Sequence, residues 1–312
     1  MKAKGVYHEG EIRAQELAAE RQAGESNGAA IGEKIMAGAL AFLKAQRMVF
    51  VSSTDAQGQR WASVLFGEPG FLHVSEDRRT LWIGFDAEKN DATDPLWENV
   101  KANKHIGVLI IELETRRRLR VNGEGQVDES SLAIRVEETY ANCPKYITRR
   151  EVRVSGPLDG NKGAEEERGT VLNETQKKLL SETDVLILAT GHPERGADAS
   201  HRGGNPGFVE VVDAKTLRVP DYVGNSMFNT IGNLLVDPHF GMLIPDFARG
   251  HLLQLTGTAK VDWHARECEY RTGETHRVVE YRVDAWRETT LPVRLEQRFV
   301  DYSPFNPPAA RK

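Results

Sequence analysis

Two stretches of this chain repeat each other at a fixed distance, and such a repeat constrains the fold before any local prediction is made. NVKANKHIGVLI (99–110) aligns with NLLVDPHFGMLI (233–244), with Asn, His, Gly, Leu and Ile in the same places. LRVNGEGQV (119–127) and LQLTGTAKV (253–261) keep the same offset. Chance would give roughly one identity in twelve residues at average composition. The chain is therefore interpreted as a duplicated unit.

A third matching pair places a small insertion in the first copy. GEPGF (67–71) matches GNPGF (204–208) at a slightly larger offset, so the first copy has three additional residues between Phe71 and Asn99. Insertions are usually found in loops, and the segment DAEKNDATD (86–94) has the composition of a loop. A chain of 312 residues is also long enough for two domains of roughly 150 residues.

Each copy is predicted to contain four strands, a helix and two further strands. An antiparallel barrel fits this order better than a doubly wound sheet, because parallel strands need a helix between most of them. In the first copy the expected elements are strands at 48–53, 61–66, 70–75, 80–83, 105–112 and 117–126 with a helix at 95–103. In the second copy they are strands at 184–189, 207–212, 216–219, 239–246 and 251–261 with a helix at 226–236, and the counterpart of the strand at 61–66 is given no bounds.

The expected domains are an N-terminal helical arm (1–34), a first barrel (35–154), a linker (155–169) and a second barrel with a C-terminal extension (170–312). Gly123 and Gly257 lie in the middle of predicted strands and indicate bulges where the barrel bends. A helix is expected to end before Pro144. An alternating segment at 279–285 predicts a final strand, and SPFNPP an extended tail.

Composition excludes several classes of protein. The 41 basic and 46 acidic residues are interspersed and give a net charge of -5, which offers no extended basic field for nucleic acid. No run approaches the roughly 20 apolar residues of a spanning helix, and the N-terminus has no apolar signal region. Cys143 and Cys268 give no disulfide framework, and the histidines show no metal-binding spacing, so no metal and a cytoplasmic location are expected.

The segment GNSMFNTIGN (224–233) carries the most informative polar pattern. Asn225, Asn229 and Asn233 recur every four residues, which would place three amides on one helical face. Helix capping by Asn225 or Ser226, and barrel support by Asn233, is the structural alternative. A helix N-terminus with amide and hydroxyl groups suits a phosphate or a ribityl chain.

The segment ASHRGGNPGFV (199–209) adds the donor groups of His201 and Arg202, and its glycines let the backbone approach a flat ligand. A surface turn would use glycine as well.

Two basic segments belong to the first copy alone. In TRRRLR (115–120), strand alternation sends Arg116, Arg118 and Arg120 to one face and Arg117 to the other. Two interpretations of this segment remain open. Arg117 or Arg118 binds a phosphate, or the arginines form a solvated strand edge that discourages pairing with other strands. YANCPKYITRR (140–150) adds Lys145, whereas Cys143 has no base beside it in sequence and is not predicted to be a catalytic thiol.

Taken together these motifs resemble the pyridoxamine 5'-phosphate oxidase-like superfamily of FMN-binding split β-barrels, and more closely its bacterial flavin-nucleotide-binding branch with duplicated barrels. The similarity rests on residues 200–209, 221–225, 233–247 and 250–257 and on NCPKYI (142–147), and spans roughly residues 35–262. It implies a mainly β, α+β fold of two tandem six-stranded Greek-key split barrels, with FMN held near the barrel–barrel interface. Ser226 and Met227 stand where related sequences carry arginine or lysine, so the phosphate contact must come from elsewhere.

The expected function is that of an FMN-dependent oxidoreductase which uses reduced nicotinamide and a small acceptor, with the redox chemistry supplied by the flavin. A flavin or haem carrier, and a barrel pair that has lost its site, are the alternatives. No catalytic residue is assigned. One composite site per chain is expected, formed either within a pseudo-dimer or by a homodimer of chains. The residues expected to bind the cofactor are Ser200, His201, Arg202, Asp221, Asn225, Ser226, Asn229, Lys145, Arg117 and Arg118.

Overall fold

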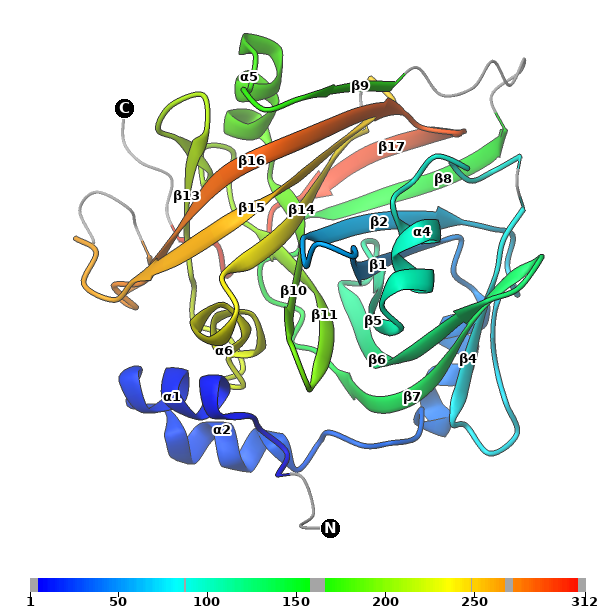
Figure 1. Ribbon diagram of the computed structural model, residues 1–312, viewed down its shortest axis with the longest axis horizontal. Helices are drawn as coiled ribbons and strands as arrows, with labels where there is room; N and C mark the ends of the chain where they lie inside the picture. The colour runs from blue at the N-terminus through cyan, green and yellow to red at the C-terminus, as the bar shows by residue number, and fades with distance from the viewer. Residues whose placement is uncertain (1–4, 87, 158–165, 248, 267–271, 308–312) are drawn as a thin grey trace.

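The structure is a computed structural model that describes residues 5–86, 88–157, 166–247, 249–266 and 272–307. It contains two large antiparallel sheets, which lie side by side (Figure 1). The first has the strand order β2-β1-β5-β6-β7-β4-β3. Its strands are β1 (Met48–Thr54), β2 (Arg60–Phe66), β3 (Leu72–Val74), β4 (Thr80–Gly84), β5 (His105–Glu112), β6 (Arg117–Val127) and β7 (Ser131–Ala141).

The second sheet repeats this topology position by position, in the order β11-β10-β14-β15-β16-β13-β12. Its strands are β10 (Val185–His192), β11 (Gly196–Gly203), β12 (Glu210–Val211), β13 (Thr216–Pro220), β14 (His239–Asp246), β15 (His251–Asp262) and β16 (Val278–Thr290). The predicted mainly β fold and the duplication are thereby confirmed.

Three further strands lie outside the repeated order. β9 (Glu166–Gly169) pairs with β16, and β8 (Arg149–Pro157) forms a two-stranded ladder with β17 (Val293–Asp301). The predicted linker 155–169 lies partly outside the described residues. The helices are α1 (Glu9–Leu17), α2 (Arg21–Gly28), the 3-10 turn η1 (Ala37–Ala39), α3 (Leu40–Lys44), α4 (Leu96–Ala102), α5 (Glu174–Glu182) and α6 (Asn229–Val236).

Each sheet has a seventh strand in addition to the six expected in a barrel. In the first copy this strand is β7, which occupies the region where the sequence suggested a helix ending before Pro144. Leu132, Ile134 and Val136 are buried and alternate with less buried residues, which is the period of a strand. The second copy has β16, which includes the final strand predicted at 279–285.

The glycines that recur in both copies confirm that the halves are equivalent in space. The registers of β6–β7 and β15–β16 both shift at the expected bulges, between Asn122 and Gly123 and between Thr256 and Gly257. An added Cβ at either glycine would lie about 2 Å from a carbonyl oxygen of the facing strand. Only glycine fits at these two positions.

A second glycine pair shows how the two barrels contact each other. A Cβ on Gly107 would lie 2.6 Å from the Ala197 carbonyl oxygen, and a Cβ on Gly241 would lie 2.6 Å from the Arg60 carbonyl oxygen. Arg60 and Ala197 are separated by the same offset as GEPGF and GNPGF, so the two contacts are equivalent under the repeat. The barrels therefore pack around an approximate twofold axis, as the two subunits of a dimer would.

Each barrel has its own apolar core, and a third cluster joins them. This shared cluster takes Phe50, Val64 and Leu109 from the first sheet and Ile187 and Leu243 from the second, all of them buried. The strands β1, β5, β10 and β11 lie at this junction (Figure 1). Continuous burial across the junction makes the two barrels one packed body.

The N-terminal arm docks on the second barrel, against α6 (Figure 1). A Cβ on Gly10 of α1 would lie 2.1 Å from the Gly232 carbonyl oxygen of α6, so the two helices approach backbone to backbone. His8 caps α1 by accepting a hydrogen bond from the Gly10 N–H, and Glu11 completes the capping box.

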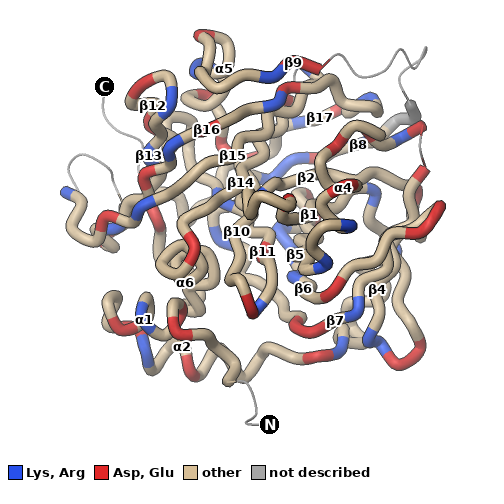
Figure 2. The backbone as a smooth tube through the Cα atoms, in the orientation of Figure 1, with Lys and Arg blue, Asp and Glu red and all other residues tan. Residues whose placement is uncertain are grey.

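The C-terminal segment is held rather than hanging as an extended tail. The Ser303 hydroxyl accepts a hydrogen bond from the Tyr146 N–H at 3.0 Å, and the Asn306 amide donates to Asn205 at 3.0 Å. Basic and acidic residues are interspersed along the backbone (Figure 2). In the described part of the chain, no helix is both long enough and apolar enough to cross a membrane.

Candidate functional site

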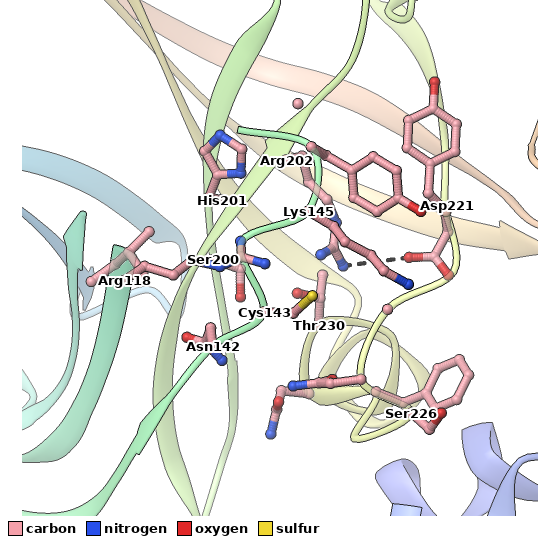
Figure 3. A pocket seen from close by; sticks show the side chains of 18 of the residues that line it. Arg118, Asn142, Cys143, Lys145, Ser200, His201, Arg202, Asp221, Ser226 and Thr230 are labelled. Carbon is pink, nitrogen blue, oxygen red and sulfur yellow. Dashed lines mark ion pairs between the residues drawn. The ribbon is translucent and has the colours of Figure 1, made fainter. Parts of the chain in front are cut away.

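A cavity of about 100 Å³ lies where the two halves meet, and both copies line it (Figure 3). The first copy contributes β6 and the segment 142–146 that follows β7. The second contributes the end of β11, the loop 220–228 and the beginning of α6. The two sets of residues that are unique to one copy thus meet at one place.

Nine of the ten residues predicted to bind a cofactor line this cavity. They are Arg118, Lys145, Ser200, His201, Arg202, Asp221, Asn225, Ser226 and Asn229. Arg117 is not among them. It projects from the opposite face of β6, is exposed, and forms an ion pair with Glu112 at 2.7 Å. This matches the solvated-edge alternative for Arg117.

Arg118 is a cation of the cavity wall whose charge has no anionic partner in the described part of the chain. No carboxylate there forms an ion pair with it, and its buried Nε atom has no hydrogen-bond partner. Burial, and then the neighbouring Arg202 cation, lowers the pKa of Arg118 to about 10. A charge held in this way favours any anion that enters.

His201 lies beside these arginines and is also unsatisfied. Its side chain is 3% exposed, and neither ring nitrogen has a hydrogen-bond partner among the described residues. Burial first, and then the cations of Arg118, Arg202 and Arg150, hold the pKa of His201 well below its usual range. The imidazole is therefore neutral at pH 7 and presents one donor and one acceptor.

An ion-pair chain forms the opposite wall of the cavity. Asp221 pairs with Arg277, whose Nε lies 2.9 Å from the carboxylate, and with Arg202 at 3.5 Å, the contact drawn as a dashed line in Figure 3. Arg202 therefore shares its partner, and Asp221 keeps Arg277 if the longer contact opens.

The helix expected at 226–236 begins later, at Asn229. Ser226 and Phe228 have positive φ values of 59° and 61°, so the chain turns sharply before the helix starts. Asn225 lies in this turn and accepts a hydrogen bond from the Met227 N–H at 3.2 Å. The predicted helical face of three amides is therefore wrong, because Asn225 lies before the helix, whereas a phosphate site at the beginning of α6 stays a prediction.

Asn229 and Asn233 instead belong to a buried polar network behind the cavity. The Asn229 amide donates to Glu11 at 2.6 Å, and its oxygen accepts from the Tyr140 hydroxyl at 3.0 Å. The Asn233 amide donates to Asp198 at 2.6 Å. The two asparagines are favourable in this helix because they satisfy buried polar groups.

Asp198 is the centre of that network. It accepts hydrogen bonds from Arg120 at 2.7 Å and from Asn122 at 2.8 Å, and Arg120 also donates to Ser200 in the cavity wall. Burial, followed by the charge of Asp198, raises the pKa of Glu11 to about 8. The same two causes raise the pKa of Glu138 to about 7. The N-terminal arm thus places the Glu11 carboxyl group, which is uncharged at pH 7, in this network.

Sequence reasoning missed several lining residues. Asn142 and Cys143 belong to the NCPKYI segment that carries part of the resemblance, and Tyr146 of the same segment forms an aromatic pair with Tyr222, with ring centroids 4.9 Å apart. Arg277 had no local signal, because only the fold brings it to Asp221. Cys268 lies outside the described residues.

One group of side chains has the composition of a metal site, but its ligand atoms are already in use. His8, Glu9 and His192 place one atom each within 4.8 Å of one another. His8 bonds to Asn233 and to Gly10, and His192 bonds to Glu9 and accepts from the Glu194 N–H. All four ring nitrogens therefore have protein partners, and no metal is assigned here.

A second hollow of about 730 Å³ lies beside α5. Its arginines are neutralised, since Arg150 pairs with Asp184 at 2.5 Å and Arg249 pairs with Asp246. The smaller cavity is the better candidate for an anionic ligand, because Arg118 has no carboxylate partner among the described residues.

Comparison with known proteins bears on the first barrel. Residues 36–157 match the family model described as "Pyridoxamine 5'-phosphate oxidase". A comparison with curated proteins found no match.

Solved structures similar to part of this chain include HupZ of Group A Streptococcus, with 14% identity over 42% of this chain and 98% of that one, and a TM-score of 0.30. An F420 reductase matches with 14% identity over 37% of this chain and 98% of its own, with a TM-score of 0.29. A FAD-binding protein of Mesorhizobium loti matches with 9% identity over 40% and 98%, with a TM-score of 0.29.

Proposed function

We propose that this chain is a flavoprotein that binds one FMN in the cavity between its barrels, and the match of residues 36–157 to the family model described as "Pyridoxamine 5'-phosphate oxidase" supports the proposal. The observation that carries the proposal is the unpaired Arg118 beside the neutral, unsatisfied His201. A phosphate would supply both with the partner they lack.

The donor set suits a flavin nucleotide. Arg118 and Lys145 offer positive charge, His201 and Ser200 offer neutral hydrogen-bonding groups, and the Tyr146–Tyr222 pair offers an aromatic wall. The cavity volume of about 100 Å³ is below the roughly 300 Å³ at which cofactor sites begin. Entry of FMN therefore requires the walls to part, and within one wall the contact between Arg202 and Asp221, at 3.5 Å, is longer than that between Arg277 and Asp221, at 2.9 Å.

Within this proposal the residues have separate tasks. Arg118 holds the phosphate by charge, and His201 orients it through a hydrogen bond without changing its protonation state. Arg202 exchanges its contact with Asp221 for one with the ligand, while Arg277 keeps Asp221 neutralised. Asp198 fixes Arg120, which in turn donates a hydrogen bond to Ser200. Bound flavin supplies hydride transfer, for which reduced nicotinamide is the proposed donor and a small molecule the acceptor.

Titration of the purified protein tests the binding part of the proposal. FMN should bind at one molecule per chain and at least tenfold more tightly than riboflavin, because a charge-assisted contact is worth about 1.5–3 kcal/mol. Equal affinities for FMN and riboflavin would refute the assignment of the phosphate to this cavity. Anaerobic bleaching of the flavin absorption by NADH or NADPH then tests the oxidoreductase part.

Haem binding is the second candidate, and His201 is the observation in its favour. An imidazole with no partner on either nitrogen among the described residues is free to bind iron, so His201 would hold the haem. Haem would give a strong Soret band that disappears in His201→Ala. In an FMN protein the same variant would keep a flavin spectrum.

A further inference from the structure

The approximate twofold axis assigns the cavity a counterpart on its other side. The corresponding residues follow from the repeat: the offset between GEPGF and GNPGF applies before the inserted loop, and the offset between NVKANKHIGVLI and NLLVDPHFGMLI applies after it. Ser63 corresponds to Ser200 of the cavity wall, and Gln254 corresponds to Arg120. Both Ser63 and Gln254 are completely buried.

Strand pairing extends the correspondence by one residue. Arg120 lies opposite Tyr140 across β6 and β7, and Gln254 lies opposite Arg287 across β15 and β16. Arg287 therefore occupies the position of Tyr140. It is 1% exposed, and no arginine of the described residues is more deeply buried.

The groups that make the open cavity basic are absent from the counterpart. Three apolar side chains stand at the corresponding positions: Val64 corresponds to His201, Leu65 to Arg202 and Leu252 to Arg118. All three are buried. A flavin phosphate would find no cation at these positions, and Arg287 is the single positive charge that faces the counterpart from the residues identified above.

Arg287 is neutralised by the inserted loop of the first copy together with Glu166 of β9, whose carboxylate lies 3.3 Å from the guanidinium. Its NH2 group donates to the Asp91 carboxylate at 2.5 Å. The neighbouring Asp94 carboxylate accepts from the Ser63 hydroxyl at 2.6 Å and from the Gln254 amide at 3.1 Å. The two carboxylates thus contact Arg287 and the counterparts of Arg120 and Ser200.

The same loop explains why this happens in one copy only. The segment between β4 and α4 corresponds to the segment between β13 and α6, which forms a wall of the open cavity, and it is three residues longer. Figure 1 shows α4 and α6 on either side of the central strands. The longer segment brings Asp91 and Asp94 inward, where the shorter one leaves space.

We propose that this chain retains one ligand cavity of a symmetric pair, and that Asp91 and Asp94 close the other by acting as internal anions on Arg287. The comparison with the open cavity rests on the proposed function, because it takes that cavity to be an anion site. The inference that the counterpart cavity is closed does not depend on the proposed function, because it is argued from the ion pairs of Arg287. It follows that Arg287 is a latent site for a small carboxylate, which becomes available when Asp91, Asp94 and the third carboxylate, Glu166, are all removed.

The test uses the intact chain and sodium acetate as the probe. In the triple variant Asp91→Ala, Asp94→Ala, Glu166→Gln, raising acetate from 10 to 200 mM should raise the midpoint of thermal unfolding by about 2 °C more than in the wild type. Adding Arg287→Met to this variant should abolish the additional rise. Asp86→Ala is the matched control, because Asp86 lies in the same loop, is exposed and contacts Lys89.

If the triple variant does not fold, the variant Asp91→Ala, Glu166→Gln carries the test, since both residues are only partly buried. An acetate response equal to that of Asp86→Ala overturns the proposal, and so do two FMN molecules bound per wild-type chain. An acetate response that depends on Arg287, in a protein that binds no flavin, supports the closed site and refutes the proposed function.

Discussion

Replacing Arg118 by methionine should stabilise the ligand-free protein and at the same time weaken its binding of FMN. The first effect follows from the unpaired charge. At pH 7 the guanidinium is protonated in both the folded and the unfolded state, so the folded state bears the full cost of a pKa that falls from its ordinary value to about 10. With allowance for solvent screening, this cost is about 1–3 kcal/mol.

The second effect follows from the proposed phosphate contact. Loss of one charge-assisted hydrogen bond should weaken FMN binding by about 10- to 150-fold and leave riboflavin binding nearly unchanged. Methionine keeps much of the side-chain volume, so a cavity term does not obscure either measurement.

Urea unfolding of the ligand-free protein and fluorescence titration with both flavins measure the two effects. Arg117→Met is the matched control, since Arg117 neighbours Arg118 in sequence but is exposed and paired with Glu112. It should change neither quantity appreciably. The reasoning fails if Arg118→Met destabilises the protein, or if its loss of FMN affinity is no larger than that of Arg117→Met.

Three further outcomes are expected. The pKa of Glu11 rises from 4.5 to about 8 on folding, so the free energy of unfolding of the wild type should decrease as the pH rises from 5 to 8. In Glu11→Gln this decrease should be smaller. An unchanged pH dependence in urea titrations would contradict the prediction. Arg202→Ala should lower FMN affinity about tenfold. The melting temperature of the ligand-free protein should change little, because Asp221 keeps its ion pair with Arg277. Arg135→Ala, at an exposed position, serves as control, and a lower melting temperature without loss of affinity would show that Arg202 has a structural role. Gly107→Ala should cost about 1–3 kcal/mol of stability by forcing a Cβ against the Ala197 carbonyl, whereas Gly38→Ala, with no atom near its Cβ, should be neutral in chemical unfolding.

The duplication could be predicted because the repeated residues are the ones that the barrels need for packing. Gly107, Gly123, Gly241 and Gly257 sit where a Cβ would strike a carbonyl oxygen, so they recur whatever the site does. The seventh strand was missed although its signal was present. SLAIRVEETYA (131–141) alternates with period two, and the interpretation of a helix ending at Pro144 took precedence over that alternation.

Nine of the ten predicted residues line the cavity, most of them at positions where the two copies differ, and their binding of a cofactor stays a prediction. The energetics of the site could not be predicted. The sequence shows an arginine at 118 but cannot show which carboxylates lie within its reach, and it shows Asn229 but not that Glu11 lies 2.6 Å away. Contacts between residues so distant in the chain depend on the docking of whole elements, which local periodicity does not specify.

The docking of the N-terminal arm sets the order in which this protein can be completed during synthesis. Glu11 bonds to Asn229, 218 residues later in the chain, and Gly10 lies against the backbone of Gly232. At about 5–20 residues per second, a ribosome needs roughly 10–40 s to make the helix that receives the arm. The arm is thus made well before the helix that receives it, and the polar network behind the cavity closes only after Asn233 has been synthesised.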